Sequence, residues 1–160
     1  MSSVRAQIGG ENQALLAKLR KLGNIQFRGL MTSIAEGLRT STIERFGSET
    51  SPGGERWQPS LRAKEGGKTL VASSALRNSI RSQVSGDGLA VGTNDIRAAT
   101  HQFGDTRTIR AKGKFLAFQI GGNWVRVKSV TVSIPARPFL GVSAEDESDI
   151  KEQLMELLED

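Results

Sequence analysis

The chain has 160 residues, 37% of them apolar, a net charge of +5 and no cysteine. That length suits one domain with a single hydrophobic core. The absence of cysteine excludes a disulfide framework and a thiolate zinc site. Because the N-terminus has no apolar signal-peptide core and no apolar run is long enough to span a bilayer, we expect a soluble intracellular protein.

The charges are divided unevenly along the chain. Residues 54–137 carry 14 basic and five acidic side chains, whereas residues 138–160 carry one basic and eight acidic side chains. Such a division can serve nucleic-acid binding, can bring opposite charges of neighbouring copies together, or can simply keep a surface solvated. Charge alone leaves all three interpretations open.

The first part of the chain predicts helices followed by a long loop. Residues 11–22 have a short amphipathic pattern, and residues 25–46 carry apolar side chains at the i, i+3, i+4, i+7 and i+11 positions of a long helix. Residues 47–69 are rich in turn-forming residues, which predicts a loop that is either functional or disordered when alone. Trp57 is the largest apolar side chain in this loop, so we expect it to anchor the loop to the body.

Two hairpins and a basic loop are predicted in the middle of the chain. Gly86-Asp87-Gly88 separates two strand patterns, at residues 81–85 and 89–93. Gly121-Gly122-Asn123 separates FLAFQI from WVRVKSVTVSI, whose residues alternate as in a single strand. The run DTRTIRAKGK, residues 105–114, is interpreted as an exposed basic loop.

Three further helices complete the predicted fold. Short ones are expected after Ser73-Ser74 and through IRAATHQF (residues 96–103), and Ser143 with Asp146 forms a capping pair for a final acidic helix. The whole chain, residues 1–160, is therefore predicted to be one α+β domain. It has N-terminal helices, central antiparallel β-hairpins with short helices, and a C-terminal helix.

His101 is the only histidine and gives little support to an enzyme. A lone histidine without cysteine cannot build a typical zinc site, and no HExxH, GxSxG, GxGxxG or GxxxxGK[ST] motif is present. A hydrolase that uses His101 as its base is a minor hypothesis, beside the simpler interpretation of a histidine that satisfies hydrogen bonds at a helix end. We expect no enzyme, no metal and no cofactor.

Non-specific DNA binding is the alternative from a different class. Basic side chains between residues 97 and 128 can contact phosphates through charge alone. Aromatic content is 5% with no tyrosine, which leaves few platforms for base stacking, and no sequence-reading motif is present. A basic loop can equally serve as a solubilising or interface element.

Four short stretches match, in the same order, four motifs of one known family. RFGSETSPGGERWQP (45–59) resembles its F…S-P-x-G-x-x-W-x-P segment. LVASSALRNSI (70–80) resembles L-x-x-S/T-G-x-L-x-x-S-I, with alanine in place of the glycine. VGTNDIRAATHQFG (91–104) resembles V-G-T-x-x-x-Y-A-x-x-H-Q-F-G, with arginine in place of the aromatic residue. IPARPFLGVS (134–143) resembles the signature I-P-A-R-P-F-L-G, which an acidic helix again follows. In these four stretches the chain resembles the phage virion morphogenesis, or tail completion, family of Mu-like phages.

The resemblance implies a structural protein of the virion that binds and does not catalyse. It implies a position at the neck, where the tail meets the DNA-filled head, after assembly in the host bacterial cytoplasm. The expected partners are other copies in a homo-oligomeric ring, taken to be a hexamer, adjacent neck and tail proteins, and double-stranded DNA passing through the channel; no membrane is expected. A tail terminator role shares this location and ring geometry, so both roles stay open.

The two prolines of IPARPFLGVS hold Ile134 and Arg137 extended, which makes the exit from the strand stiff. Such a corner can be packing alone, or can also present Arg137 to a neighbouring copy. The basic middle of one copy is expected to meet the acidic last helix of the next. The interface candidates are Trp57, His101, Gln102, Phe103, Arg137 and Phe139, and the candidates for DNA or ring contact are Arg107, Arg110, Lys112 and Lys114.

Overall fold

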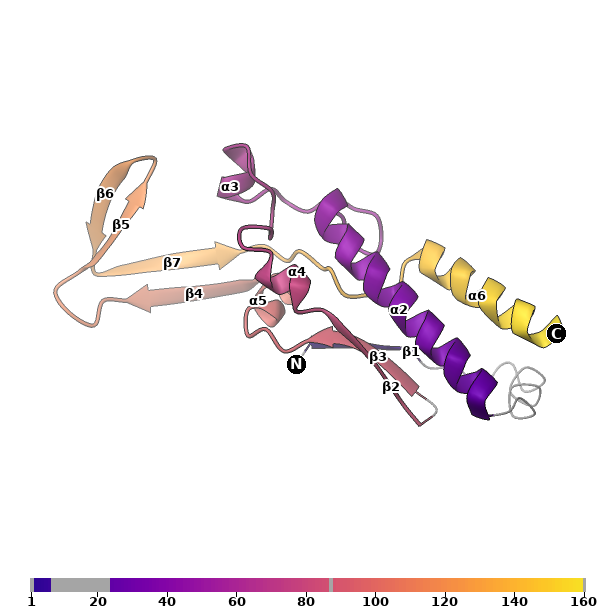
Figure 1. The fold of residues 1–160 in the computed structure, drawn as a ribbon. Coiled ribbons are helices and arrows are strands. Elements are labelled where there is room, and N and C mark those ends of the chain that lie inside the picture. The colour runs from indigo at the N-terminus through magenta and orange to yellow at the C-terminus, as the bar shows by residue number, and fades with distance from the viewer. Residues whose placement is uncertain (1, 7–23, 87, 160) are drawn as a thin grey trace.

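A body of helices and one sheet carries a long projecting β-arm in the computed structural model, which describes residues 2–6, 24–86 and 88–159 (Figure 1). The elements, in chain order, are β1 (Ser2–Ala6), α2 (Asn24–Ser48), α3 (Leu61–Lys64), α4 (Ala75–Asn78), β2 (Arg81–Ser85), β3 (Gly88–Thr93), α5 (Ala98–Phe103), β4 (Asp105–Arg110), β5 (Leu116–Ile120), β6 (Asn123–Val127), β7 (Ser129–Ile134) and α6 (Ala144–Glu159). The predicted α+β class is confirmed. The helix expected over residues 11–22 lies outside the described residues.

Helix α2 forms because its apolar side chains recur at helical spacing. Leu30, Ile34 and Leu38 lie about one turn apart and are buried, and Phe46 continues the same face two turns later. This face packs on β2 and β3, and α6 packs beside α2. The helix predicted over residues 25–46 is confirmed, with one more residue at its start and two at its end.

The sheet of the body has the strand order β1–β3–β2, with both pairs antiparallel. In β3, Leu89, Val91 and Thr93 are buried and the residues between them are half-buried, as the alternation of a strand requires. The hairpin of β2 and β3 is confirmed. Strand β1 was not predicted, because a five-residue strand has little pattern of its own and its partner β3 follows more than 80 residues later.

A nested pair of β-ribbons, residues 105–134, forms the arm. Strands β4 and β7 pair from Asp105↔Ile134 to Arg110↔Ser129, and the tip hairpin of β5 and β6 is inserted between them. The prediction of a basic loop is therefore wrong for residues 105–110, which form β4. Alternating threonine and arginine, with one isoleucine, is compatible with an exposed strand, and the charges masked that pattern.

The predicted single strand WVRVKSVTVSI is also wrong in detail. It divides at Lys128 into β6, which pairs with β5, and β7, which pairs with β4. The loop predicted over residues 47–69 is likewise more ordered than expected, because it contains α3 and a β-bridge between Thr50 and Arg56. Helix α4 confirms the short helix expected after Ser73-Ser74. Helix α5 begins at Ala98, two residues later than predicted. Among the described residues, no helix combines the length and apolar character that crossing a bilayer requires.

Candidate interaction surfaces

The segment of residues 135–143, called the corner here, is where the chain passes from β7 to α6. Hydrogen bonds attach it to several distant segments, and three of them involve Arg137 and Pro138. The Arg137 backbone N–H donates to the His101 carbonyl at 2.7 Å, and its Nε donates to the Gln58 carbonyl at 2.7 Å. The Trp57 Nε1 donates to the Pro138 carbonyl at 2.8 Å. Trp57 thus attaches the long segment after α2 to the corner.

Three aromatic rings pack under the corner. Phe139 and Phe46 are fully buried, and their ring centroids lie 5.3 Å apart. Trp57 meets Phe46 edge to face at 5.6 Å, with an interplanar angle of 80°. Both separations lie in the range that favours aromatic pairs. The corner therefore joins the end of α2, the segment after it and the start of α6 in one core.

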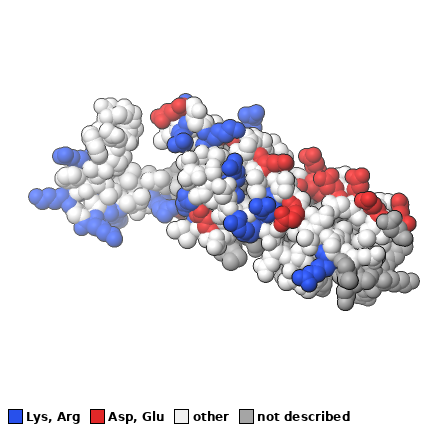
Figure 2. Space-filling model, viewed as in Figure 1, with Lys and Arg blue, Asp and Glu red and all other residues white. Residues whose placement is uncertain are grey.

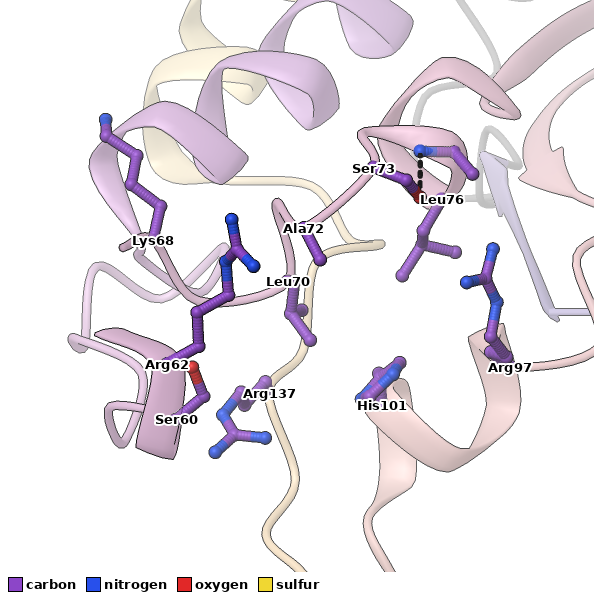
Figure 3. Close-up of a pocket in the computed structure, with 11 residues that line it drawn as sticks. Ser60, Arg62, Lys68, Leu70, Ala72, Ser73, Leu76, Arg97, His101 and Arg137 are labelled. Carbon is purple, nitrogen blue, oxygen red and sulfur yellow. Dashed lines mark hydrogen bonds between the residues drawn. The ribbon is translucent and has the colours of Figure 1, made fainter. Parts of the chain in front are cut away.

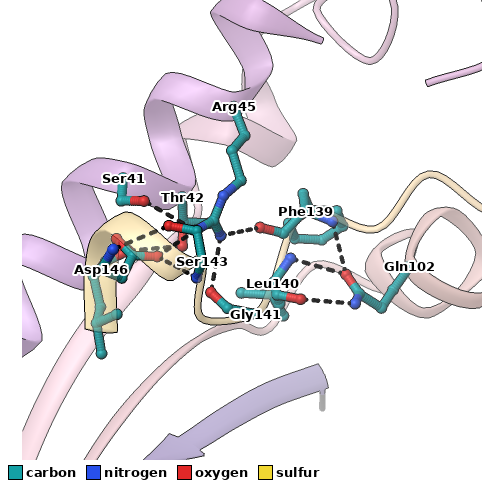
Figure 4. Close-up of polar contacts among 10 residues, drawn as sticks. Ser41, Thr42, Arg45, Gln102, Phe139, Leu140, Gly141, Ser143 and Asp146 are labelled. Atoms are coloured by element: carbon teal, nitrogen blue, oxygen red, sulfur yellow. Dashed lines mark hydrogen bonds and ion pairs between the residues drawn. The ribbon is translucent and has the colours of Figure 1, made fainter. Parts of the chain in front are cut away.

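The side chain of Gln102, on α5, forms hydrogen bonds with the backbone of the corner (Figure 4). Its Oε1 accepts from the N–H groups of Phe139 and Leu140, at 3.1 and 3.0 Å, and its Nε2 donates to the Leu140 carbonyl at 3.0 Å. One amide side chain thereby satisfies two backbone donors and one acceptor that would be expensive to bury without partners. Gln102 therefore joins two segments of the same chain.

A buried ion pair closes the other side of the corner (Figure 4). Arg45 of α2 meets the Asp146 carboxylate at 2.6 Å, and both side chains are about 6–7% exposed. Arg45 also donates to the carbonyls of Phe139 and Gly141, at 3.0 and 2.9 Å. Asp146 and Ser143 cap α6 reciprocally, with distances of 2.8 and 3.1 Å, so the predicted capping pair is confirmed.

The charges of this pair respond differently to burial. Burial lowers the pKa of Arg45, although Asp146 opposes the effect. Burial acts to raise the pKa of Asp146, but hydrogen bonds from Ser143 and Ser41 and the charge of Arg45 bring it below the ordinary value. Sequence reasoning missed Arg45, although it lies seven residues after Leu38 on the apolar face of α2. An arginine on such a face signals a buried partner.

Two glycines of the motifs permit close approach at the corner. A Cβ on Gly104, whose φ is +75°, would lie 2.9 Å from both the Ile134 carbonyl oxygen and the Ala136 nitrogen. A Cβ on Gly141 would lie 2.5 Å from the Pro52 ring. Neither backbone contact at Gly104 can yield easily, so a side chain there would push the end of α5 away from the corner.

His101 lies in a pocket that basic side chains line (Figure 3). The basic residues are Arg62, Lys68, Arg97 and Arg137, which come from four different segments. The His101 Nδ1 is buried and has no hydrogen-bond partner among the described residues. The chemistry of this lining suits an anionic group.

Burial lowers the pKa of His101, and the charges of Arg137 and Arg97 lower it further. The opposing charge of Asp95 is itself paired with Arg97 at 2.5 Å, a hydrogen bond that lowers the pKa of Asp95 to about 2. Because these effects bring the pKa of His101 below its ordinary value, the neutral imidazole predominates at pH 7. In the described part of the chain, no three histidine, cysteine, aspartate or glutamate side chains lie close enough together to hold a metal ion.

The structure divides the predicted contact residues into three groups. Trp57, Arg137 and Phe139 are buried in the chain's own fold, and His101 and Gln102 are partly buried beside them. Phe103 is 72% exposed on α5. The candidates for DNA or ring contact, all exposed and all on the arm, are Arg107, Arg110, Lys112 and Lys114. The interface roles of these ten residues stay predictions.

Comparison with known proteins gives the relatives of this chain. A model of the phage virion morphogenesis family matches residues 11–159. The Mu-like prophage FluMu G protein 2 of Haemophilus influenzae is 32% identical over 127 residues, which are 79% of this chain and 75% of that protein. No solved structure matches the chain. The motifs that converge on the corner are those that resemble this family, and the chain belongs to the phage virion morphogenesis family.

Proposed function

We propose that this protein is a structural component of the phage neck, a tail completion or head–tail joining protein that assembles as a ring and catalyses no reaction. Family membership supports a role in building the virion. The main observation in favour of ring assembly is the separation of positive and negative charge within the molecule. Figure 2 shows basic side chains on the arm and acidic side chains along α6, at opposite ends of the molecule.

Opposite charges at opposite ends favour head-to-tail contacts between copies. Such heterologous contacts generate a closed ring when the rotation between copies closes, and six copies are proposed. The corner supports this arrangement, because its buried hydrogen bonds and ion pair hold the base of the arm and the start of α6 in a fixed relation. We assign no catalytic role to His101 or to the pocket around it.

Electron microscopy of lysates tests the proposal. The parent phage would carry a stop codon in this gene, and a phage complemented with the intact gene is the matched control. We expect DNA-filled heads beside separate tails of normal length. Overlong tails would instead support the terminator role, and normal infectious virions would overturn a role in assembly.

Non-specific DNA binding is the second candidate, favoured by the exposed basic side chains of the arm. Phosphate contacts make affinity fall steeply as salt rises, with a slope set by the number of contacts. Titration of a duplex of arbitrary sequence at several salt concentrations measures that slope. If replacing Arg110 and Lys112 by glutamine weakens duplex binding and makes its salt dependence less steep, the result would support this candidate. If the parent protein does not bind the duplex at low salt, this candidate would be excluded.

A further inference from the structure

The arm is not held together by a core of its own. Every residue from 105 to 134 is exposed or only partly buried, whereas the body contains all the buried side chains of the described chain. Six residues of β4 reach roughly 20 Å from the body at about 3.3 Å per residue. Two-stranded ribbons of this kind are marginally stable alone in water. Contact with another surface would therefore stabilise the arm more than it would stabilise the body.

Large apolar side chains are exposed on the tip of the arm. Trp124 is 70% exposed, Ile120 60% and Phe115 47%. Basic residues border them, since the Arg126 guanidinium lies 4.9 Å from the Phe115 ring centroid and Lys128 directly follows the end of β6. Aromatic anchors with a charged rim are typical of protein interfaces.

The opposite end of the molecule offers a complementary surface. Ile150, Leu154 and Leu157 of α6 pack against the core, which leaves the other side of the helix exposed. There, Met155 is 61% exposed and is surrounded at helical spacing by acidic residues. The acidic face of α6 consists of Glu152, Met155, Glu156 and Glu159.

We propose that the tip hairpin of one copy docks on the acidic face of α6 in the next copy. Trp124 packs against Met155, and Arg126 and Lys128 lie against Glu156 and Glu159. The arm and α6 lie at opposite ends of one molecule, so this contact requires two copies (Figures 1 and 2). The proposal rests on the ring of the proposed function and names its interface.

Charge and apolar surface together favour a second copy over DNA as the occupant of the tip. The arm carries six basic side chains and one acidic one, and α6 carries seven acidic side chains and one basic one. Phosphates would match the arm's charge but would leave the exposed side chains of Trp124 and Ile120 without an apolar partner. The acidic face of α6 supplies both kinds of contact.

Disulfide trapping tests the docking directly, because the chain has no cysteine of its own. Gln119→Cys places a thiol across the ladder from Trp124, and Glu152→Cys places one on the acidic face. An equal mixture of the two purified full-length variants should give a cross-linked dimer at several times the yield of either alone. The double variant should give a ladder of oligomers. Gln83→Cys, on the exposed side of β2, replaces Glu152→Cys in the control mixture.

Charge reversal separates contact from misfolding. Arg126→Glu with Lys128→Glu, introduced into the Gln119→Cys chain, should lower the cross-linking yield at least tenfold. Glu156→Lys with Glu159→Lys in the Glu152→Cys chain should do the same, and combining both reversed partners should restore the yield. Arg62→Glu with Lys64→Glu on exposed α3 is the charge-matched control and should leave it unchanged.

Each remaining outcome also decides the proposal. Cross-linking that the reversed pair fails to restore, or that the α3 control lowers equally, would overturn the docking. Loss of duplex binding without loss of cross-linking in the arm variant would assign the basic rim to DNA and overturn its proposed contact with α6. Virions that form normally without the gene would overturn the proposed function alone, because trapping uses purified protein. Separate heads and tails with no trapped pair would overturn the docking alone.

Discussion

The corner and the arm have similar fractions of apolar residues but are stabilised in opposite ways. At the corner, Phe139 is fully buried and its backbone N–H is paired with Gln102. On the arm, the ribbon of β4 and β7 joins its strands mainly by backbone hydrogen bonds and by cross-strand hydroxyl pairs such as Thr108 with Thr131. The corner is complete within one chain, whereas the arm leaves its large side chains in water.

This difference separates residues that maintain the fold from residues that can contact a partner. The family-like motifs gather at the corner, where burial accounts for Trp57, Arg137 and Phe139. The exposed residues of the arm have no such explanation inside the chain. Substitution at the corner should therefore change stability, and substitution on the arm should change assembly.

The two tryptophans, one packed against the corner and one on the arm, give the largest expected contrast. Trp57→Ala should destabilise the protein by about 3–5 kcal/mol, because it removes a buried ring and leaves the Pro138 carbonyl without its donor. Trp124→Ala should change stability by about 0.5 kcal/mol or less. Urea unfolding followed by circular dichroism measures both. Equal losses would mean that the arm is packed as firmly as the corner.

Breaking the buried ion pair should come next. Asp146→Ala leaves Arg45 charged and buried without its carboxylate, which should cost about 3 kcal/mol. Asp149→Ala, on the exposed side of α6, is the matched control and should cost about 0.5 kcal/mol or less. Thermal unfolding of the two variants and the parent gives the comparison. A control that loses as much as Asp146→Ala would attribute the effect to the helix rather than to the pair.

Alanine substitution of two glycines compares the corner and the arm at the level of the backbone. Gly104→Ala should destabilise by about 1–3 kcal/mol, because its Cβ would meet the backbone of the corner and its φ is positive. Gly113→Ala, where the arm leaves open space, should have an effect within about 0.5 kcal/mol. Chemical denaturation midpoints measure both variants. A neutral Gly104→Ala would show that α5 can move away from residues 134–136 without loss.

Acid should act on the corner, with the smallest expected effect. The pKa of Asp146 is lower in the folded protein than its ordinary value, so its contribution to stability is present above about pH 4 and is lost as pH falls through the folded pKa. Denaturant midpoints of the parent and Asp146→Asn, measured between pH 7 and 3, should therefore converge on acidification. A gap that stays constant across this range would contradict the direction of the pKa shift.

Local patterns explain which parts of the fold were predictable. The spacing of Leu30, Ile34 and Leu38 encodes α2, and Ser143 with Asp146 encodes the start of α6, since each signal lies within a few residues. The strand β4 was missed because its alternating basic residues resemble a loop until β7 is known to lie beside it. Trp57 was expected to anchor its segment because it is the largest apolar side chain there, and its burial agrees with that expectation; the burial of Arg137 was not predicted.

The sequence by itself determined helices α2, α4, α5 and α6, the turns of the two hairpins, the capping of α6 and the division of charge, because periodicity, turn residues and composition act over short distances. Only the tertiary structure decided that Arg45 pairs with Asp146 across 101 positions, that β1 joins β3, and that the basic residues project on an arm. These arrangements depend on which distant segments exclude water together. The pairing of distant segments depends on burial in the whole fold, and the sequence of one segment does not encode it.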